Sequence, residues 1–272
     1  MIAVYITFGI LLALFILYFL SLRGRRNHKM LRSLQGWSYA HRGLHGEGVP
    51  ENSMAAFRLA LENGYGIELD VHLMADGKLA VIHDPSLKRT AGAEVLIEDL
   101  TAEDLAAYRL EGTEERIPLF ADVLALYEGK APMIVELKSE RNNYAALAEA
   151  VCDLIEDYTG DYCLESFDPR VIHWLRKNRP CQCRGQLAEN FVRNKRSKLP
   201  FHLKFVLTHQ LENFLVRPDF VAYKFADRKL LGVWLVRKLW GIQGVTWTLR
   251  SQQEHDAAVK EGWLPIFEGF RP

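Results

Sequence analysis

The sequence lacks the features of a disulfide-stabilised or nucleic-acid-binding protein. Only four cysteines occur in 272 residues, and Cys181 and Cys183 lie too close together for an ordinary zinc half-site, so we expect reduced thiols. The formal net charge is zero, which argues against a general nucleic-acid binder. No long linker rich in proline, glycine or serine interrupts residues 33–272, and no strong internal repeat is present there.

Charged side chains are also absent from residues 1–22. The mainly apolar run 2–20 is long enough for about 30 Å of helix, which matches the hydrocarbon core of a bilayer. A cleaved signal peptide is the alternative, but it needs a basic start, a shorter apolar core and a small-residue cleavage site, and none of these is present. We therefore expect residues 1–22 to be an uncleaved transmembrane anchor.

Acidic side chains are missing from the first 32 residues, although five basic ones occur there: Arg23, Arg25, Arg26, Lys29 and Arg32. The remainder, residues 33–272, holds 29 basic and 34 acidic residues, a net charge of −5. Basic residues next to a membrane span stay in the cytoplasm. We expect a single-pass protein of the cell membrane, with a basic juxtamembrane linker over 23–36 and a cytoplasmic domain over 37–272.

The domain contains short apolar runs that alternate with longer amphipathic ones, a pattern typical of a parallel α/β fold. Its length of about 240 residues favours a (β/α)₈ TIM barrel over a doubly wound sheet. The turn signal Asp76-Gly77 predicts a hairpin, and the segment from Pro85 to about Glu115 then forms a small insertion after the second strand. The expected strands are residues 38–40, 66–71, 133–137, 162–166, 183–187, 204–207, 220–223 and 244–248.

Carboxylates lie inside two of these apolar strands. Glu68 and Asp70 are two residues apart, so both side chains point to one face of their strand, and Glu136 lies in the next barrel strand. Buried carboxylates need a cation or other partners, and an all-oxygen set suits a hard divalent cation such as Mg²⁺ or Ca²⁺. A purely structural ion-pair network is the alternative interpretation.

Basic and titratable side chains accompany these carboxylates at the predicted strand ends. His41 and Arg42 follow the first strand, and His83 follows the hairpin. Lys138 comes two residues after Glu136. Histidines suit proton transfer near neutral pH, whereas arginine and lysine suit a phosphate oxyanion.

Taken in order, these motifs resemble those of the glycerophosphodiester phosphodiesterases over residues 37–267. The matching stretches are His41-Arg42-Gly43, Pro50-Glu51-Asn52-Ser53, Glu68-Leu69-Asp70-Val71, Asp76-Gly77, His83-Asp84, Arg89-Thr90, Ile117-Pro118-Leu119, Glu136-Leu137-Lys138, Ser166-Phe167-Asp168 and Trp247-Thr248. The resemblance implies a TIM barrel that binds a divalent metal. It also implies hydrolysis of a glycerophosphodiester to glycerol 3-phosphate and an alcohol.

The resemblance assigns a role to each matching residue. It implies an acid/base pair (His41, His83), metal ligands (Glu68, Asp70, Glu136) and substrate-binding residues (Arg42, Glu51, Lys138, Trp247). Glu51 is expected either to orient His41 or to contact the substrate.

Two positions depart from the family pattern. Ser53 replaces the usual threonine and should still cap its helix, whereas Phe267-Glu268 replaces the usual Thr-Asp and puts contacts at the last strand in doubt. His45 and His72 match no family role, and we expect them at the surface or behind the site residues.

Two other functions use the same barrel. One is lysophospholipase D-type hydrolysis of membrane lysophospholipids, which places a longer group at the same site. The other is a non-catalytic phosphate-binding barrel, whose signature would be the loss of a histidine or carboxylate.

The segment 228–240 also has two interpretations, since it combines an apolar face with basic ends. It is either an ordinary barrel helix or a basic-aromatic surface that touches anionic lipid, together with a second basic stretch over 193–204.

Overall fold

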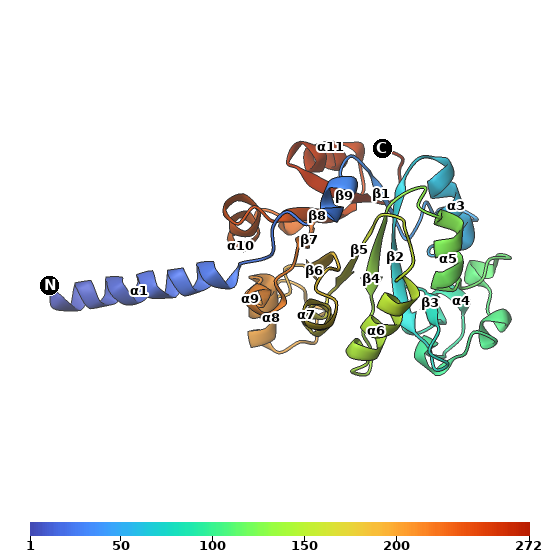
Figure 1. Ribbon diagram of the computed structural model, residues 1–272, viewed down its shortest axis with the longest axis horizontal. Helices are drawn as coiled ribbons and strands as arrows, with labels where there is room; N and C mark the ends of the chain where they lie inside the picture. Colours follow the sequence, from blue (N-terminus) through green and yellow to red (C-terminus); the bar gives the residue numbers. More distant parts are fainter.

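Eight parallel strands close into a barrel at the centre of the protein (Figure 1). The computed structural model describes all residues, 1–272. The strands follow the order β1-β2-β4-β5-β6-β7-β8-β9, and β9 pairs with β1 to complete the circle. Their bounds are β1 Tyr39–His41, β2 Gly66–Leu73, β4 Met133–Leu137, β5 Tyr162–Ser166, β6 Arg184–Ala188, β7 Phe220–Lys224, β8 Gln243–Leu249 and β9 Trp263–Phe267. The predicted TIM barrel is confirmed.

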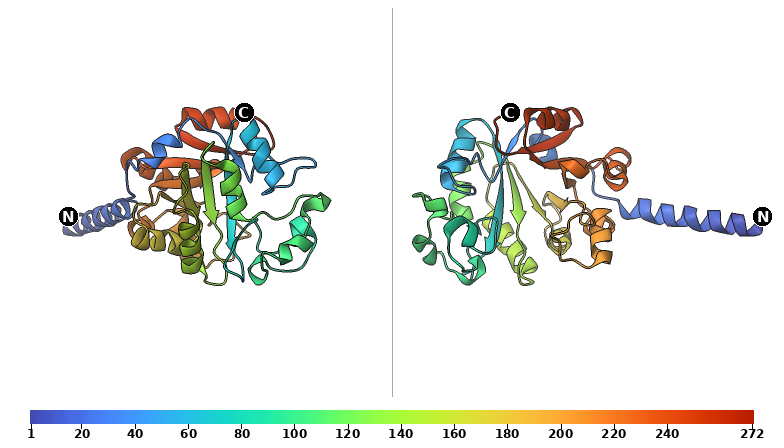
Figure 2. Two further views of the ribbon diagram at one scale, coloured as in Figure 1. Left: turned by 45° about the vertical axis from the view of Figure 1, so that its right-hand side comes forward. Right: turned by 180° about the vertical axis from the view of Figure 1, so that it is seen from behind.

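Helices connect the strands and cover the outside of the barrel (Figures 1 and 2). They are α3 Met54–Glu62, α5 Phe120–Tyr127, α6 Tyr144–Leu154, α7 Pro169–Asn178, α8 Phe201–Thr208, α9 Asn213–Val216, α10 Leu231–Trp234 and α11 Gln252–Lys260. Ser53 caps α3 by accepting a hydrogen bond from the backbone N–H of Ala56 (3.1 Å), as expected for a serine at this position. Asp168 caps α7 in the same way, just before a proline at the first helical position.

Two expected elements differ from the structure. Residues 204–207, predicted as a strand, lie inside α8, and the eighth barrel strand is β9. The prediction was wrong because the apolar run in α8 imitates a short strand, whereas Pro265 in the middle of β9 lacks the N–H that a strand normally donates. The segment 228–240 is helical only over residues 231–239, where α10 continues without a break into the π-helical turn η5 (Leu235–Leu239).

The insertion after the second barrel strand forms a small unit beside the barrel. Strand β3 (Leu79–Val81) pairs antiparallel with the end of β2, which confirms the predicted hairpin. The following residues form α4 (Lys88–Ala91) and the 3₁₀ turns η1 (Ile97–Asp99), η2 (Asp104–Ala107) and η3 (Leu110–Gly112). They pack around an apolar cluster of their own, on the side of the barrel away from the N-terminus (Figure 1).

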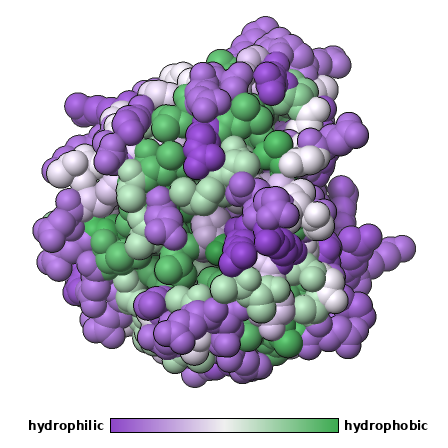
Figure 3. Space-filling view, turned by 90° about the vertical axis from the view of Figure 1, so that its right-hand side faces the viewer, coloured by the Kyte–Doolittle hydropathy of each residue, from purple (hydrophilic) through white to green (hydrophobic).

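Helix α1 (Ile2–Ser21) projects from the barrel and is the one helix long and apolar enough to cross a membrane (Figure 2). None of its residues is buried against the rest of the protein. Figure 3 shows the side of the molecule that faces away from α1. On this side, hydrophilic residues surround hydrophobic residues nearer the centre of the view.

The segment predicted as a linker packs onto the barrel. Arg25 forms an ion pair with the buried carboxylate of Asp219, just before β7. Helix α2 (Met30–Ser33) and the following residues bring Leu31 and Leu34 into an apolar cluster with Tyr39 at the start of β1. Residues 23–36 therefore close the N-terminal end of the barrel instead of extending freely from it.

Candidate active site

Four carboxylates form a layer inside the barrel near the carboxyl ends of the strands. Glu68 and Asp70 point inward from β2, because the alternating residues of that strand pack outward against the helices. The strand register places Glu136 of β4 beside Asp70, and Glu165 of β5 beside Glu136. Sequence reasoning missed Glu165, although its position in the apolar strand Tyr162–Ser166 carries the same signal as Glu136.

Three of these carboxylates are arranged as a cation site. Oxygens of Glu68, Asp70 and Glu136 lie within 4.8 Å of one another, and each residue is at most 6% exposed. Burial and the neighbouring carboxylates raise the pKa of Glu68 well above its usual value, and burial raises the pKa of Glu136 to about 7. Such a buried all-oxygen set fits a hard divalent cation, which would relieve this repulsion.

Lys138 and Asn52 complete the surroundings of Asp70. The Lys138 Nζ lies 3.0 Å from an oxygen of Glu136 and 3.3 Å from an oxygen of Asp70. The Asn52 side-chain amide donates to the other Asp70 oxygen at 2.8 Å. Burial opposes the ionisation of Asp70, but Lys138 and the other nearby positive charges outweigh it and hold its pKa well below the usual range.

A tight turn after β1 carries Arg42. Arg42 has a φ of +54° and Gly43 a φ of +80°. A Cβ on Gly43 would lie 2.8 Å from the Cβ of Ala56, so this position needs a glycine. The Arg42 backbone N–H points back to Glu68 (3.2 Å), while its guanidinium approaches Asp70 at 3.5 Å. The turn thus directs one positive charge at the carboxylate layer.

Glu51 holds two arginines rather than a histidine. One of its oxygens accepts from Arg42 at 2.8 Å, and Arg89 of the insertion donates to both Glu51 oxygens at 2.7 and 2.9 Å. Glu51 has no hydrogen bond to His41, so the structure does not support the expectation that it orients that ring. Its observed role is to connect Arg42 with the insertion.

His41 at the end of β1 is oriented by Glu268 instead. Its Nδ1 lies 2.7 Å from a Glu268 oxygen, and Arg250 donates to both oxygens of the same carboxylate. Burial opposes the ionisation of Glu268, but the hydrogen bonds from His41 and Arg250 lower its pKa to about 2. Burial lowers the pKa of His41 itself, against the opposing effect of Glu268. Glu268, which departs from the expected Thr-Asp pattern, therefore contacts the first histidine of the proposed pair, His41.

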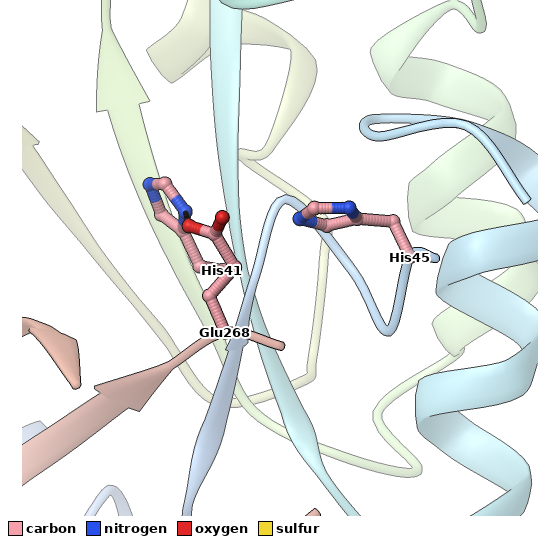
Figure 4. A group of neighbouring side chains, drawn as sticks. All are labelled: His41, His45 and Glu268. Carbon is pink, nitrogen blue, oxygen red and sulfur yellow. Dashed lines mark hydrogen bonds and ion pairs between the residues drawn. The ribbon is translucent and has the colours of Figure 1, made fainter. Parts of the chain in front are cut away.

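His45 lies near the same carboxylate, which is placed on the side of the His41 ring that faces His45 (Figure 4). The three side chains His41, His45 and Glu268 are close enough to share a cation. However, the Arg250 guanidinium already donates to both oxygens of Glu268. We therefore interpret Glu268 as the residue that orients His41.

His83 follows β3 and is held in the same manner as His41. Its Nδ1 lies 2.6 Å from an oxygen of Asp84, whose other oxygen accepts from Arg89 at 2.5 Å. Burial lowers the pKa of His83 to about 4. His72 is fully buried rather than at the surface, where it lies 3.2 Å from the His83 carbonyl oxygen and 2.6 Å from Glu98. It supports the backbone of His83 from behind.

These side chains surround a cavity of about 240 Å³. Its lining comprises His41, Arg42, Glu68, His83, Glu136, Glu165, Phe167, Leu187, Trp247, Thr248, Arg250 and Ile266. One wall is aromatic, because Phe167 and Trp247 pack edge to face with their ring centroids 5.6 Å apart. Six of the nine residues expected at the site line this cavity. The other three contact residues of the lining: Asp70 and Glu51 contact Arg42, and Lys138 contacts Glu136.

The family follows from the sequence profile that matches this chain. The profile described as the glycerophosphoryl diester phosphodiesterase family covers residues 41–267, which include every site residue from His41 to Trp247. The chain belongs to this family. As a family member with named enzymes among its relatives, it is an enzyme of the phosphodiesterase class.

Named relatives agree with this assignment. A glycerophosphodiester phosphodiesterase of Caldanaerobacter subterraneus is 37% identical over 239 residues, which cover 82% of this chain and 89% of that protein. One of Bacillus altitudinis is 40% identical, but the match covers 44% of this chain and about half (52%) of that protein. A lysophospholipase D of Rattus norvegicus is 33% identical over 45% of this chain and 42% of its own length.

Solved structures share the fold. An Oleispira antarctica phosphodiesterase in complex with the product sn-glycerol-3-phosphate has a TM-score of 0.72 at 19% identity, covering 87% of this chain and 94% of that chain. A Thermotoga maritima glycerophosphodiester phosphodiesterase has a TM-score of 0.65 at 26% identity, covering 85% and 93%. These enzymes thus share the overall fold of this chain.

Proposed function

We propose that this enzyme hydrolyses glycerophosphodiesters to sn-glycerol 3-phosphate and an alcohol, with His41 and His83 as the acid/base pair. The observation that carries the proposal is the cavity itself, which places both histidines beside the carboxylate layer and Arg42. The named relative from Caldanaerobacter subterraneus and the product complex of the Oleispira antarctica phosphodiesterase support the choice of substrate.

The two histidines are prepared for proton transfer in equivalent ways. Each ring uses its Nδ1 for a carboxylate, Glu268 in one case and Asp84 in the other. This leaves the Nε2 of each ring for the substrate. One histidine removes a proton from the attacking hydroxyl, and the other gives a proton to the leaving oxygen. Both an attack by water and an attack by the neighbouring glycerol hydroxyl are compatible with this pair.

Positive charge at the cavity stabilises the phosphate. Arg42 and Lys138 lie beside the carboxylate layer, where they attract the phosphodiester anion. We propose that Glu68, Asp70 and Glu136 hold one divalent cation, Mg²⁺ or Ca²⁺. When bound, such a cation stabilises the charge that develops on the phosphoryl oxygens. Trp247 and Phe167 border the remaining space and exclude water from one side of it.

Lysophospholipase D-type hydrolysis is the second candidate, and the aromatic wall favours it. Phe167 packs against Trp247 inside the cavity and against Phe191 outside it, with centroids 5.6 and 6.1 Å apart. Val192, the next residue, is exposed. A row of apolar side chains therefore runs from the cavity wall toward α8, and its chemistry suits an acyl chain.

One assay separates the two candidates. The full chain in detergent micelles is given glycerophosphocholine or lysophosphatidylcholine with Mg²⁺ or Ca²⁺, and choline release is measured for both. We expect release from glycerophosphocholine, with glycerol 3-phosphate as the second product, and strongly reduced release by the His41→Ala, His83→Ala double variant. Release from lysophosphatidylcholine alone would favour the second candidate, and release from neither would refute both.

We propose further that α1 crosses the cell membrane and leaves the barrel in the cytoplasm. Five basic residues follow α1 directly, and such residues stay on the cytoplasmic side. The last turn of α1 also packs on the barrel, since the Trp240 indole N–H donates to the Phe19 carbonyl at 2.9 Å.

Cysteine labelling tests this topology. Cys181 is exposed, whereas the other three cysteines are buried. A membrane-impermeant maleimide should label Cys181 only after the cells are permeabilised, while an Ile2→Cys variant should be labelled in intact cells. Labelling of Cys181 in intact cells would contradict the proposed orientation.

A further inference from the structure

Large apolar side chains are exposed on one side of the barrel. Apart from α1, exposed residues of this kind gather on α8, α9, α10 and η5, which we call the α8–α10 face. Representative members are Phe201, Phe205, Phe214, Leu231, Trp234 and Leu239. Contiguous exposed apolar surface of this sort marks a contact with a membrane or another protein.

Helix α1 leaves the barrel within this face (Figures 1 and 2). Phe19 stacks on Trp240, which follows η5, with ring centroids 4.8 Å apart. The Leu22 side chain is fully buried in a cluster that includes Leu235 of η5, and its carbonyl accepts from Asn213 of α9 at 3.5 Å. The end of the helix is therefore fixed to the elements that carry the exposed apolar residues.

The length of α1 determines how close the α8–α10 face lies to the bilayer. Its 20 residues span about 30 Å, the thickness of a bilayer hydrocarbon core. Because the last turn already contacts the barrel, the neighbouring elements lie within about one helical turn of the end of the span. At that depth they reach the boundary between acyl chains and headgroups. Aromatic residues such as Phe19 and Trp240 are enriched at this boundary.

The segments that form this face are rich in basic residues, of which Arg228 pairs with Glu261 of a neighbouring loop. Residues 191–218 contain six Lys or Arg, and their one acidic residue, Glu212, is 5% exposed. Residues 228–240 contain four Lys or Arg and no acidic residue. Basic residues combined with exposed Trp, Phe and Leu are the composition of surfaces that lie on anionic membranes, where each basic residue contributes about 1 kcal/mol.

We propose that the α8–α10 face rests in the headgroup region of the leaflet that α1 enters, with anionic phospholipid as its partner. The proposal rests on the membrane anchor argued above. The barrel then lies against the bilayer in a fixed orientation instead of moving freely on a tether. Phe191 and Val192, which precede α8, extend the row of apolar side chains from the cavity wall to the same face.

Depth-dependent quenching of attached fluorophores tests the orientation. The full chain with Cys181→Ser is reconstituted in vesicles of phosphatidylcholine and phosphatidylglycerol that contain a nitroxide-labelled lipid. Single cysteines carry the fluorophore at Leu231 in the α8–α10 face or at Val259 in α11. These positions are matched, because Leu231 is 62% and Val259 51% exposed. A third variant, Ile10→Cys, reports on the anchor.

We expect strong quenching at Ile10, several-fold stronger quenching at Leu231 than at Val259, and a decrease at Leu231 when phosphatidylglycerol is omitted. Equal, weak quenching at Leu231 and Val259 with strong quenching at Ile10 would overturn the proposed surface but leave the anchor intact. Weak quenching at Ile10 would overturn both. Neither result depends on hydrolysis, so the proposed activity is judged separately in the choline assay.

Discussion

The barrel interior contains two layers of opposite character. At the N-terminal end, Leu31, Leu34 and Tyr39 pack with Phe220 and Ile134 into an apolar plug. At the C-terminal end, four buried carboxylates face Arg42, Lys138 and the two histidines. The strands that carry both layers are the same, so the difference arises only from which residues point inward at each level. The apolar end stabilises the barrel, and the charged end holds the residues proposed for the chemistry.

Removal of divalent cations should have the largest effect on hydrolysis. It should affect only the charged layer, because the apolar layer holds none of the proposed cation ligands. We expect excess EDTA to abolish hydrolysis and Mg²⁺, Mn²⁺ or Ca²⁺ to restore it, because the Glu68, Asp70 and Glu136 oxygens lie close together and buried. Glu136→Gln should raise the metal concentration needed for half-maximal activity, whereas the exposed control Glu94→Gln should not. Full activity in excess EDTA would rule out the metal site.

Glu268→Gln should have the next largest effect, through His41. Loss of the carboxylate should lower kcat about 10- to 10²-fold with little change in KM, because the ring loses the partner of its Nδ1. The Glu268 hydrogen bond raises the pKa of His41, so its loss should also move the His41 limb of the pH–rate profile to lower pH. A control is Glu128→Gln on the surface. An unchanged kcat and profile would show that Glu268 does not position His41.

Leu34→Ala should damage the apolar layer and spare the charged one. Leu34 is fully buried in the plug, and its truncation should cost about 2–5 kcal/mol of stability. The melting temperature in detergent should fall clearly, while kcat at 25 °C stays close to wild type. The exposed control Leu231→Ala should leave the melting temperature unchanged. A loss of kcat without a loss of stability would contradict the separation of the two layers.

Glu212→Gln should have the smallest effect on hydrolysis, and its effect on stability should grow as the pH rises above about 4.5. Both carboxylate oxygens of Glu212 are buried without a partner, and burial raises its pKa to about 8. Because the pKa of Glu212 is higher in the folded protein than in the unfolded chain, its carboxyl group stabilises the fold fully below about pH 4.5. This stabilisation is lost as the pH rises to 8, at about 1.4 kcal/mol per pH unit. Melting temperatures between pH 6 and 9 should therefore decline less in Glu212→Gln than in wild type. Identical pH profiles would refute the raised pKa.

The charged layer was largely predictable from the sequence, because its residues stand out in apolar strands. The two-residue spacing of Glu68 and Asp70 is enough to place both on one face, and the adjacent strand brings Glu136 beside them. Glu268 could not be assigned a contact in this way. It lies 227 residues from His41 in sequence, and only closure of the barrel through β9 brings them together.

The apolar layer was harder to predict. Strand β9, which brings Leu264 and Ile266 into this layer, was missed. Residues 204–207 of α8 were predicted as a strand in its place, because a short apolar run fits a helix and a strand equally well. Packing of the basic segment 23–36 under the barrel was missed, because its positive charges suggested a linker and hid the buried Leu31 and Leu34. Charged residues that follow the alternation of a strand were thus easier to recognise in the sequence than residues that become buried only through tertiary packing.

A double-mutant comparison at His41 and His83 tests the proposed chemistry most directly. Glycerol 3-phosphate release from glycerophosphocholine is measured for wild type, His41→Ala, His83→Ala and the double variant, each with an unchanged melting temperature. We expect each single variant to lose about 10²- to 10⁴-fold in kcat, and the double variant to be little worse than the poorer single one, because the two groups act together. Near-normal turnover in either single variant would contradict the central claim that this pair performs the hydrolysis.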